Sequence, residues 1–276
     1  MKIGYTDNPV SETLGIFPGS YFVSVCSSPE LLSKNGFNLI ELHLQTFGEA
    51  EKEKELKRYV TKIMRCFDLV MHCPFIGLEG GTYRLLLPEK VLSNTMSEKA
   101  DINKIIRVEE LCGELGIKFL TIHASSAMKM INEGEYSNFK KTILKLNWLA
   151  KSQGVMLCVE TGGLSEEQLV DLTKNGLNIT FDTSHFFLDM TQLGIDGEKA
   201  NQKTLEFFIS NQIYIPVVHM SQPVDGKDAH ASILDSGMIN VHKTMLNFIK
   251  DKNLNTRVIF EFKPNPNLKA EDYFKR

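Results

Sequence analysis

Side chains of the types that bind metal ions recur at one position along this sequence, at or just after the ends of apolar segments. Nine residues share this placement: His72, His123, Glu160, Asp182, His185, His219, Asp228, His230 and Glu261. Imidazole nitrogen and carboxylate oxygen are the usual ligands of catalytic zinc. A group of such ligands can hold ions that activate water and neutralise charge on a phosphoryl group. These residue types therefore predict a divalent metal centre, with Glu160 and Glu261 as its catalytic carboxylates.

The carboxylates carry more weight in this prediction than the histidines. A single histidine in an apolar segment is more often an ordinary core residue. Glu160 in VMLCVET and Glu261 in VIFEF are different, because burying an unpaired charge costs several kcal/mol. A salt bridge would satisfy them, but the apolar segments contain few lysines or arginines. Glu41 and His43 share one face of another segment, where they either line a pocket or form a salt bridge at its rim.

Short apolar segments alternate with amphipathic, charged ones along the whole chain. The eight apolar segments are residues 2–6, 37–44, 68–74, 118–124, 155–161, 177–183, 215–221 and 257–263. Nearly continuous runs of Val, Ile and Leu are typical of parallel strands buried on both faces. Eight repeats of strand and helix, with no spare strand, predict an α/β fold: a (β/α)₈ TIM barrel that forms a single domain over residues 1–276.

Local signals mark the helices between these strands. Ser165 and Gln168 form a capping-box pattern at the start of SEEQLVDLTKN. Gly116, Gly154 and Gly176 each stand between a helical pattern and the next strand, where a glycine that ends a helix belongs. His242, in a helical pattern, is expected at the surface.

The proposed ligands would all lie at the carboxyl ends of the strands, where barrel active sites are built. Two unusually long connections, residues 75–96 and 221–239, follow strand ends on the same side. Long ordered loops in compact domains are usually functional, so we expect both to border the site. Trp148 is expected to anchor a helix to the barrel.

The overall composition excludes several classes of protein. The net charge is −3, so the whole chain has no basic excess of the kind that binds nucleic acid. The five cysteines are odd in number and lack a CxxC pair, which argues against a disulfide framework or a four-cysteine zinc site. No segment is apolar over the length of a membrane span or resembles a signal peptide. We expect a cytoplasmic monomer without a membrane partner.

The ordered set of candidate ligands resembles that of endonuclease IV, also called AP endonuclease family 2. The similarity runs from about residue 68 to 263 and includes TIHASS, VETGG, FDTSHFF, VVHMS, the D-x-H pair with a later SGMIN, and VIFEF. The wider group of xylose-isomerase-like barrels, which the chain also resembles, includes sugar isomerases and epimerases.

The resemblance to endonuclease IV implies three zinc ions and cleavage of DNA 5′ to abasic sites by metal-activated hydroxide. It assigns His72, His123 and Glu160 to the first ion; Glu160, Asp182, His219 and Glu261 to the second; and His185, Asp228 and His230 to the third. It also implies that Phe75 corresponds to an aromatic residue that enters the DNA stack, although an aromatic side chain there could equally cover a sugar.

Three segments depart from the pattern of that family. Residues 3–15 do not resemble its usual opening, Ser221 and Gln222 replace an Asn and an Asp, and the acidic segment 45–53 lacks the basic residues of a DNA-inserting loop. The alternative is a sugar or sugar-phosphate isomerase or epimerase with one manganese or magnesium ion. In that interpretation the ligands of the second ion hold the only ion, and Glu160 or Glu261 moves a proton.

Overall fold

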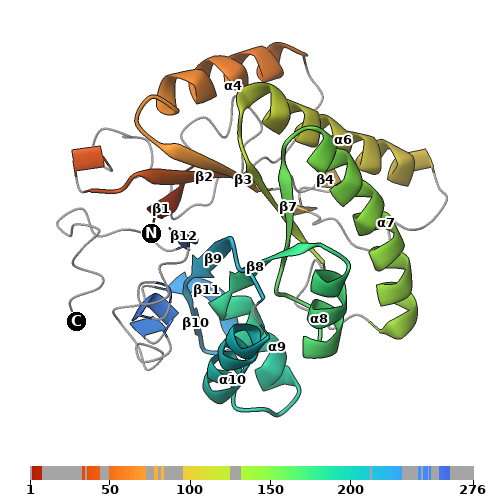
Figure 1. Ribbon diagram of the computed structural model, residues 1–276, viewed down its shortest axis with the longest axis vertical. Coiled ribbons are helices and arrows are strands. Elements are labelled where there is room, and N and C mark those ends of the chain that lie inside the picture. Colours follow the sequence, from red (N-terminus) through yellow and green to blue (C-terminus); the bar gives the residue numbers. More distant parts are fainter. Residues whose placement is uncertain are drawn as a thin grey trace.

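Eight parallel strands close into a barrel in a computed structural model of the chain (Figure 1). The structure describes residues 2–7, 33–34, 36–43, 50–72, 78–79, 82–83, 96–124, 132–211, 213–231, 242–243, 245–247, 249 and 255–261. The strands of the barrel are β1 (Lys2–Asp7), β2 (Leu39–His43), β3 (Asp68–His72), β6 (Phe119–His123), β7 (Met156–Glu160), β8 (Asn178–Asp182), β9 (Val217–Met220) and β12 (Arg257–Phe260). Each coincides with one of the predicted apolar segments, so the predicted TIM barrel is confirmed.

The described helices lie outside the ring of strands (Figure 1). They are α4 (Ala50–Ile63), α6 (Met96–Leu115), α7 (Glu133–Ser152), α8 (Glu166–Lys174), α9 (Thr183–Gln192) and α10 (Gly197–Ser210). The predicted capping box at α8 is present, because Ser165 Oγ accepts from Gln168 N while Gln168 Oε1 accepts from Ser165 N. The predicted helix-ending glycines are confirmed by positive φ angles of 73°, 74° and 79° at Gly116, Gly154 and Gly176.

Alternation along the strands separates the core into two clusters. One contains the side chains inside the barrel: Leu39, Val70, Phe119, Cys158, Val217 and Ile259. The other contains their strand neighbours, such as Ile40 and Leu157, together with helix residues such as Val108 and Ile143. Side chains on a strand alternate between its two faces, so the residue two positions after each of these apolar residues also points into the barrel. That position holds His72 on β3, Glu160 on β7 and His219 on β9, and it holds Glu261 directly after the end of β12.

Two short antiparallel pairs occur in the predicted long connections. The second connection contains β10 (Gln222–Val224) and β11 (Lys227–Ala231), joined by Asp225 and Gly226 with φ angles of 50° and 70°. Two positive φ angles are typical of a type I′ turn, which the Asp-Gly pair favours. This segment was predicted only as a long loop, although Asp225-Gly226 is a sequence pair that favours a hairpin turn. The first connection contains β4 (Leu78–Glu79) paired with β5 (Thr82–Tyr83).

Two predicted placements are wrong. Trp148 does not anchor α7, because its side chain is 70% exposed. The buried residues of α7 follow one stripe at helical spacing, through Ile143, Leu146 and Ala150, and Trp148 lies off that stripe. His242 is buried rather than at the surface, and its Nε2 lies 3.2 Å from Thr183 Oγ1. No helix in the part of the chain that the structure describes is both long and apolar enough to cross a membrane.

Glu109 is a buried carboxylate on α6, away from the inside of the barrel. Its side chain is 1% exposed, and among the residues that the structure describes neither carboxylate oxygen has a hydrogen-bond partner. Burial, reinforced by the neighbouring charge of Glu110, raises the pKa of Glu109 to about 8. The folded protein therefore keeps this group protonated over a range of pH in which an exposed glutamate would be ionised.

This difference predicts a pH-dependent stability. Because the folded-state pKa of Glu109 is raised, its contribution to stability is complete below about pH 4.5 and is lost as the pH rises towards 8. Glu109→Gln should remove this loss. The variant should then exceed the wild type in free energy of unfolding at pH 8.5 by several kcal/mol, since a pKa difference of one corresponds to about 1.4 kcal/mol.

Urea unfolding at pH 5 and pH 8.5 measures the effect. Glu110→Gln is the matched control, because Glu110 is the next residue on α6 and its side chain is 44% exposed. The control should keep most of the pH dependence of the wild type. An unchanged pH dependence in Glu109→Gln would contradict the interpretation.

Candidate metal centre

Three carboxylates converge on one nitrogen of His219, which lies on β9 and has no exposed surface. His219 Nδ1 lies 3.3 Å from Glu261 Oε1, 3.4 Å from Glu160 Oε2 and 3.7 Å from Asp182 Oδ2. Glu160 and Asp182 end β7 and β8, and Glu261 directly follows β12. Four strand ends thus bring one nitrogen and three oxygens to a common point.

Further histidines surround the carboxylate of Glu160. The distance from Glu160 Oε2 is 3.1 Å to His72 Nε2 and 3.4 Å to His123 Nε2, and Glu160 Oε1 lies 2.6 Å from His185 Nδ1. His72 Nε2 and His123 Nε2 are themselves 3.1 Å apart. Glu160 therefore contacts both the His219 group and a second set of imidazoles, as a ligand shared by two ions would.

A helix N-terminus positions Asp182 and His185. Asp182 is the N-cap of α9, and its Oδ1 accepts from the backbone N of His185 at 2.6 Å. The cap fixes the carboxylate at the strand end and places His185 in the first turn, next to Glu160. Helix α9 was not among the predicted helices, because FDTSH was assigned only to a strand and to the site. An N-cap Asp before an apolar segment was the signal that could have identified it.

Seven of the nine predicted ligands lie together in this cluster: His72, His123, Glu160, Asp182, His185, His219 and Glu261. The other two, Asp228 and His230, lie on β11, but their side chains are outside the part that the structure describes. Phe75 is also outside the described residues. The predicted roles of these three side chains therefore stay predictions.

Glu41 belongs to the cluster, although the sequence analysis did not include it among the ligands. It lies on β2, has no exposed surface, and its Oε1 is 3.0 Å from His219 Nε2. Within the described part of the chain, three sets of side chains have one ligand atom each within 4.8 Å of one another: His72, Glu160 and His219; His123, Glu160 and His185; Glu41, His219 and Glu261. The signal for Glu41 was its place two residues after Leu39, on the inward face of the strand.

The acids and imidazoles shift one another's pKa values strongly. Burial by itself raises the pKa of Glu160, but His123 and His185 outweigh it and hold that pKa well below its usual value. Burial, reinforced by the other carboxylates, raises the pKa of Glu261 well above its usual value, although His219 opposes this. Burial lowers the pKa of His123 to about 3. The imidazole of His123 is therefore neutral at pH 7 and available as a ligand.

The donor set fits a divalent cation. Asp182 Oδ2 and His219 Nδ1 are buried, and neither takes part in a hydrogen bond with good geometry among the described residues. Leaving buried polar atoms in this state costs about 1–3 kcal/mol each, which a cation between them would offset. Carboxylate and imidazole ligands together suit zinc and manganese, whereas carboxylates alone would favour calcium or magnesium.

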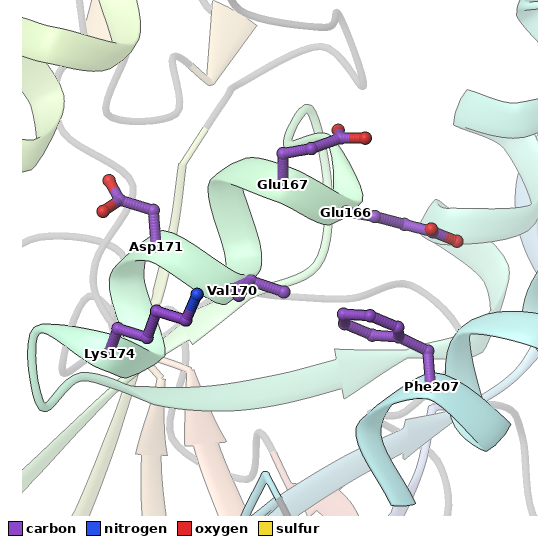
Figure 2. A pocket seen from close by; sticks show the side chains of 6 residues that line it. All are labelled: Glu166, Glu167, Val170, Asp171, Lys174 and Phe207. Atoms are coloured by element: carbon purple, nitrogen blue, oxygen red, sulfur yellow. The ribbon is translucent and has the colours of Figure 1, made fainter. Parts of the chain in front are cut away.

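A groove on the outer surface of the molecule lacks the converging acids and histidines of the metal centre. It lies outside the barrel between α8 and α10 and has a volume of about 330 Å³. Figure 2 shows Phe207 of α10 facing Val170 of α8, with the carboxylates of Glu166 and Glu167 at one end. Asp171, which also lines the groove, is paired with Lys140 at 2.6 Å. The described residues that line the groove include no histidine and no buried acid, so they contribute nothing to the metal centre.

Comparisons with known proteins agree with this fold. The family model described as "Xylose isomerase-like TIM barrel" matches residues 29–275. No curated protein sequence is similar enough to count as a relative. Among solved structures, a D-tagatose 3-epimerase-like protein is 19% identical, with a TM-score of 0.62 and coverage of 100% of this chain and 94% of that chain.

Two other solved structures are epimerases. D-psicose 3-epimerase from Clostridium cellulolyticum H10, determined with D-tagatose, is 15% identical with a TM-score of 0.60, over 100% of this chain and 89% of that chain. An L-ribulose 3-epimerase is 15% identical with a TM-score of 0.63, over 99% and 84%. At such low identities the likeness concerns the fold alone, and none of the three neighbours is an endonuclease. The match over nearly the whole chain shows that the protein belongs to the xylose isomerase-like TIM barrel family.

Proposed function

We propose that this protein is a divalent-metal-dependent epimerase or isomerase of a small sugar or sugar phosphate. The observation that carries the proposal is the convergence of Glu160, Asp182 and Glu261 on His219 Nδ1 at 3.3–3.7 Å. Four such ligands would hold one ion, and an octahedral ion such as Mn²⁺ would still accept substrate oxygens. The printed names of the three structural neighbours, all epimerases or epimerase-like, support the same class of reaction.

The residues of this cluster suit proton transfer beside a carbonyl group. A bound divalent ion would polarise the carbonyl oxygen and so acidify the hydrogen on the adjacent carbon. Glu160 or Glu261 then removes that proton, and a carboxyl group returns one to the opposite face for epimerisation or to the neighbouring carbon for isomerisation. His72, His123 and His185 lie beside Glu160, where their ring nitrogens can bind substrate hydroxyls.

The charge of the chain favours a small substrate over DNA. The net charge is −3, and the segment 45–53, which follows the second strand of the barrel, is acidic. Lysine and arginine contacts to phosphates supply much of the affinity of DNA-binding proteins. A small sugar needs no such surface, because hydrogen bonds and metal ligation inside a barrel mouth provide its affinity.

One observation favours a second candidate, a three-zinc phosphodiesterase acting on abasic DNA. His123, Glu160 and His185 form a second set of atoms close enough to hold an ion. A single-metal isomerase does not require these histidines as ligands, whereas Glu160 could bridge two zinc ions in the phosphodiesterase. The two candidates therefore differ in metal count and in substrate.

Substitution of Glu261 tests the proposed proton transfer. Glu261→Gln should lower the turnover of an active ketose by roughly 10²–10⁴-fold, since the amide cannot carry the proton. The assay screens ketoses and ketose phosphates in the presence of Mn²⁺ and records product by chromatography and uptake of solvent deuterium by mass spectrometry. Glu166→Gln, at the outer groove, is the control and should behave as the wild type. If Glu261→Gln turned over a sugar as fast as the wild type does, this role of Glu261 would be ruled out.

Metal analysis separates the two candidates. We expect close to one tightly bound divalent ion per chain and no cleavage of a duplex that contains an abasic site. Elemental analysis of the purified protein gives the count, and a gel assay on the duplex measures cleavage. Three zinc ions per chain, together with cleavage that Glu261→Gln abolishes, would overturn the proposed function in favour of the phosphodiesterase.

A further inference from the structure

Glu41 and His219 form a buried pair inside the barrel, between strands far apart in the sequence. Glu41 Oε1 lies 3.0 Å from His219 Nε2, and neither side chain has exposed surface. We propose that Glu41 is a positioning residue, which fixes the ring of His219 so that Nδ1 points at Glu160, Asp182 and Glu261. This inference rests on the proposed metal centre, in which His219 is a ligand.

The hydrogen bond selects one tautomer of His219. An ionised carboxylate only accepts hydrogen bonds, so Glu41 requires the hydrogen on Nε2. Burial alone would lower the pKa of His219, but Glu261 and Glu41 outweigh it and raise that pKa well above its usual value, so the ring without a metal carries both hydrogens readily. A histidine that binds a metal is neutral and carries one ring hydrogen, and with that hydrogen on Nε2 the lone pair is on Nδ1. That lone pair faces the oxygens of Glu261, Glu160 and Asp182 at 3.3, 3.4 and 3.7 Å. With the hydrogen on Nε2, the point where the three carboxylates and Nδ1 meet would be open to a cation, which these four groups would hold.

The geometry argues that Glu41 acts through His219 rather than as a ligand beside it. The two nitrogens of an imidazole ring point away from each other, so an ion bound at Nδ1 lies on the side of the ring opposite Glu41. Metal-bound histidines commonly donate their other ring hydrogen to a carboxylate, which fixes the ring and strengthens it as a donor. The pair described here has this arrangement.

The surroundings of Glu41 hold it in place. It lies on β2 two residues after Leu39, which packs in the apolar layer inside the barrel with Val217 and Ile259. β2 and β9 are separated by β1 and β12 in the ring of strands, so the contact spans the interior. A carboxylate buried at this depth requires close polar partners, and His219 Nε2 at 3.0 Å is one of them. Loss of Glu41 would leave the ring of His219 free to rotate or to place its hydrogen on Nδ1.

Metal affinity measured without any substrate tests the inference. Glu41→Ala should bind Zn²⁺ about 10–100-fold more weakly than the wild type, the usual cost of losing such a partner. Glu41→Gln should lose less, because its amide oxygen still accepts from Nε2. Competition with a chromophoric chelator gives the dissociation constants. Glu109→Gln, which alters another buried carboxylate but lies outside the barrel, is the matched control and should bind as the wild type.

Two spectroscopic readouts separate positioning from a merely structural role and from direct ligation. Nitrogen-15 spectra of histidine-labelled, zinc-loaded protein should show His219 with its hydrogen on Nε2 in the wild type and in Glu41→Gln. The visible spectrum of the Co²⁺ form should be the same in both, because the ligand set is unchanged. A changed Co²⁺ spectrum in Glu41→Gln would make Glu41 a ligand and overturn the inference.

This test of Glu41 does not depend on finding a substrate. Wild-type affinity in both Glu41 variants would also overturn the inference. If Glu41→Ala does not fold, as circular dichroism would show, the nearly isosteric Glu41→Gln and the nitrogen spectra still decide it. If the variants lose affinity as expected but no sugar is turned over, the positioning role stands and the proposed function fails.

Discussion

The burial of many ionisable groups at one end of the barrel constrains the rest of this structure. Four carboxylates and four imidazoles meet there: Glu41, Glu160, Asp182, Glu261, His72, His123, His185 and His219. Each charge removed from water must be matched by another at short range, because an isolated buried ion is prohibitively unstable. Glu160 contacts four of the histidines, so its position fixes how the remaining groups can be arranged. A divalent cation is the simplest way to complete this balance of charge.

The barrel supplies the rigidity that such a cluster requires. Below the ionisable groups lies a layer of apolar side chains, which includes Val70, Cys158 and Val217. Among the strands whose side chains the structure describes, β2, β3, β6, β7, β8, β9 and β12, the outward-facing residues belong to the same core cluster as helix residues, so these strands are packed on their outer face as well. At β8 the chain turns directly into α9, and the N-cap bond of Asp182 fixes that carboxylate. Six of the seven described ligands therefore lie on strands or on a helix, and Glu261 directly follows β12.

The cluster alone is compatible with two kinds of chemistry. A centre of carboxylates and histidines can polarise a carbonyl group or activate water for phosphodiester cleavage. The surface around the barrel mouth selects between them, because DNA requires a basic surface and a small sugar requires a closed pocket. Net charge and the acidic segment 45–53 favour the proposed sugar substrate.

The sequence by itself determined the eight strands, the caps of α8 and most of the cluster. These features depend on local patterns: alternation along a strand, and signals within a few residues of a helix end. Because the carboxyl ends of parallel strands meet at one rim, placing ligands at strand ends was enough to bring His72, Glu160 and His219 together.

Only the tertiary structure decided which atoms meet across the barrel. Glu41 and His219 are 178 residues apart, and their contact exists because closure of the barrel brings the inward faces of β2 and β9 within reach. The burial of His242 against Thr183 and the exposure of Trp148 likewise depend on how helices pack on their neighbours. No local pattern encodes these distances, since the segments involved meet only when the whole ring of strands has formed.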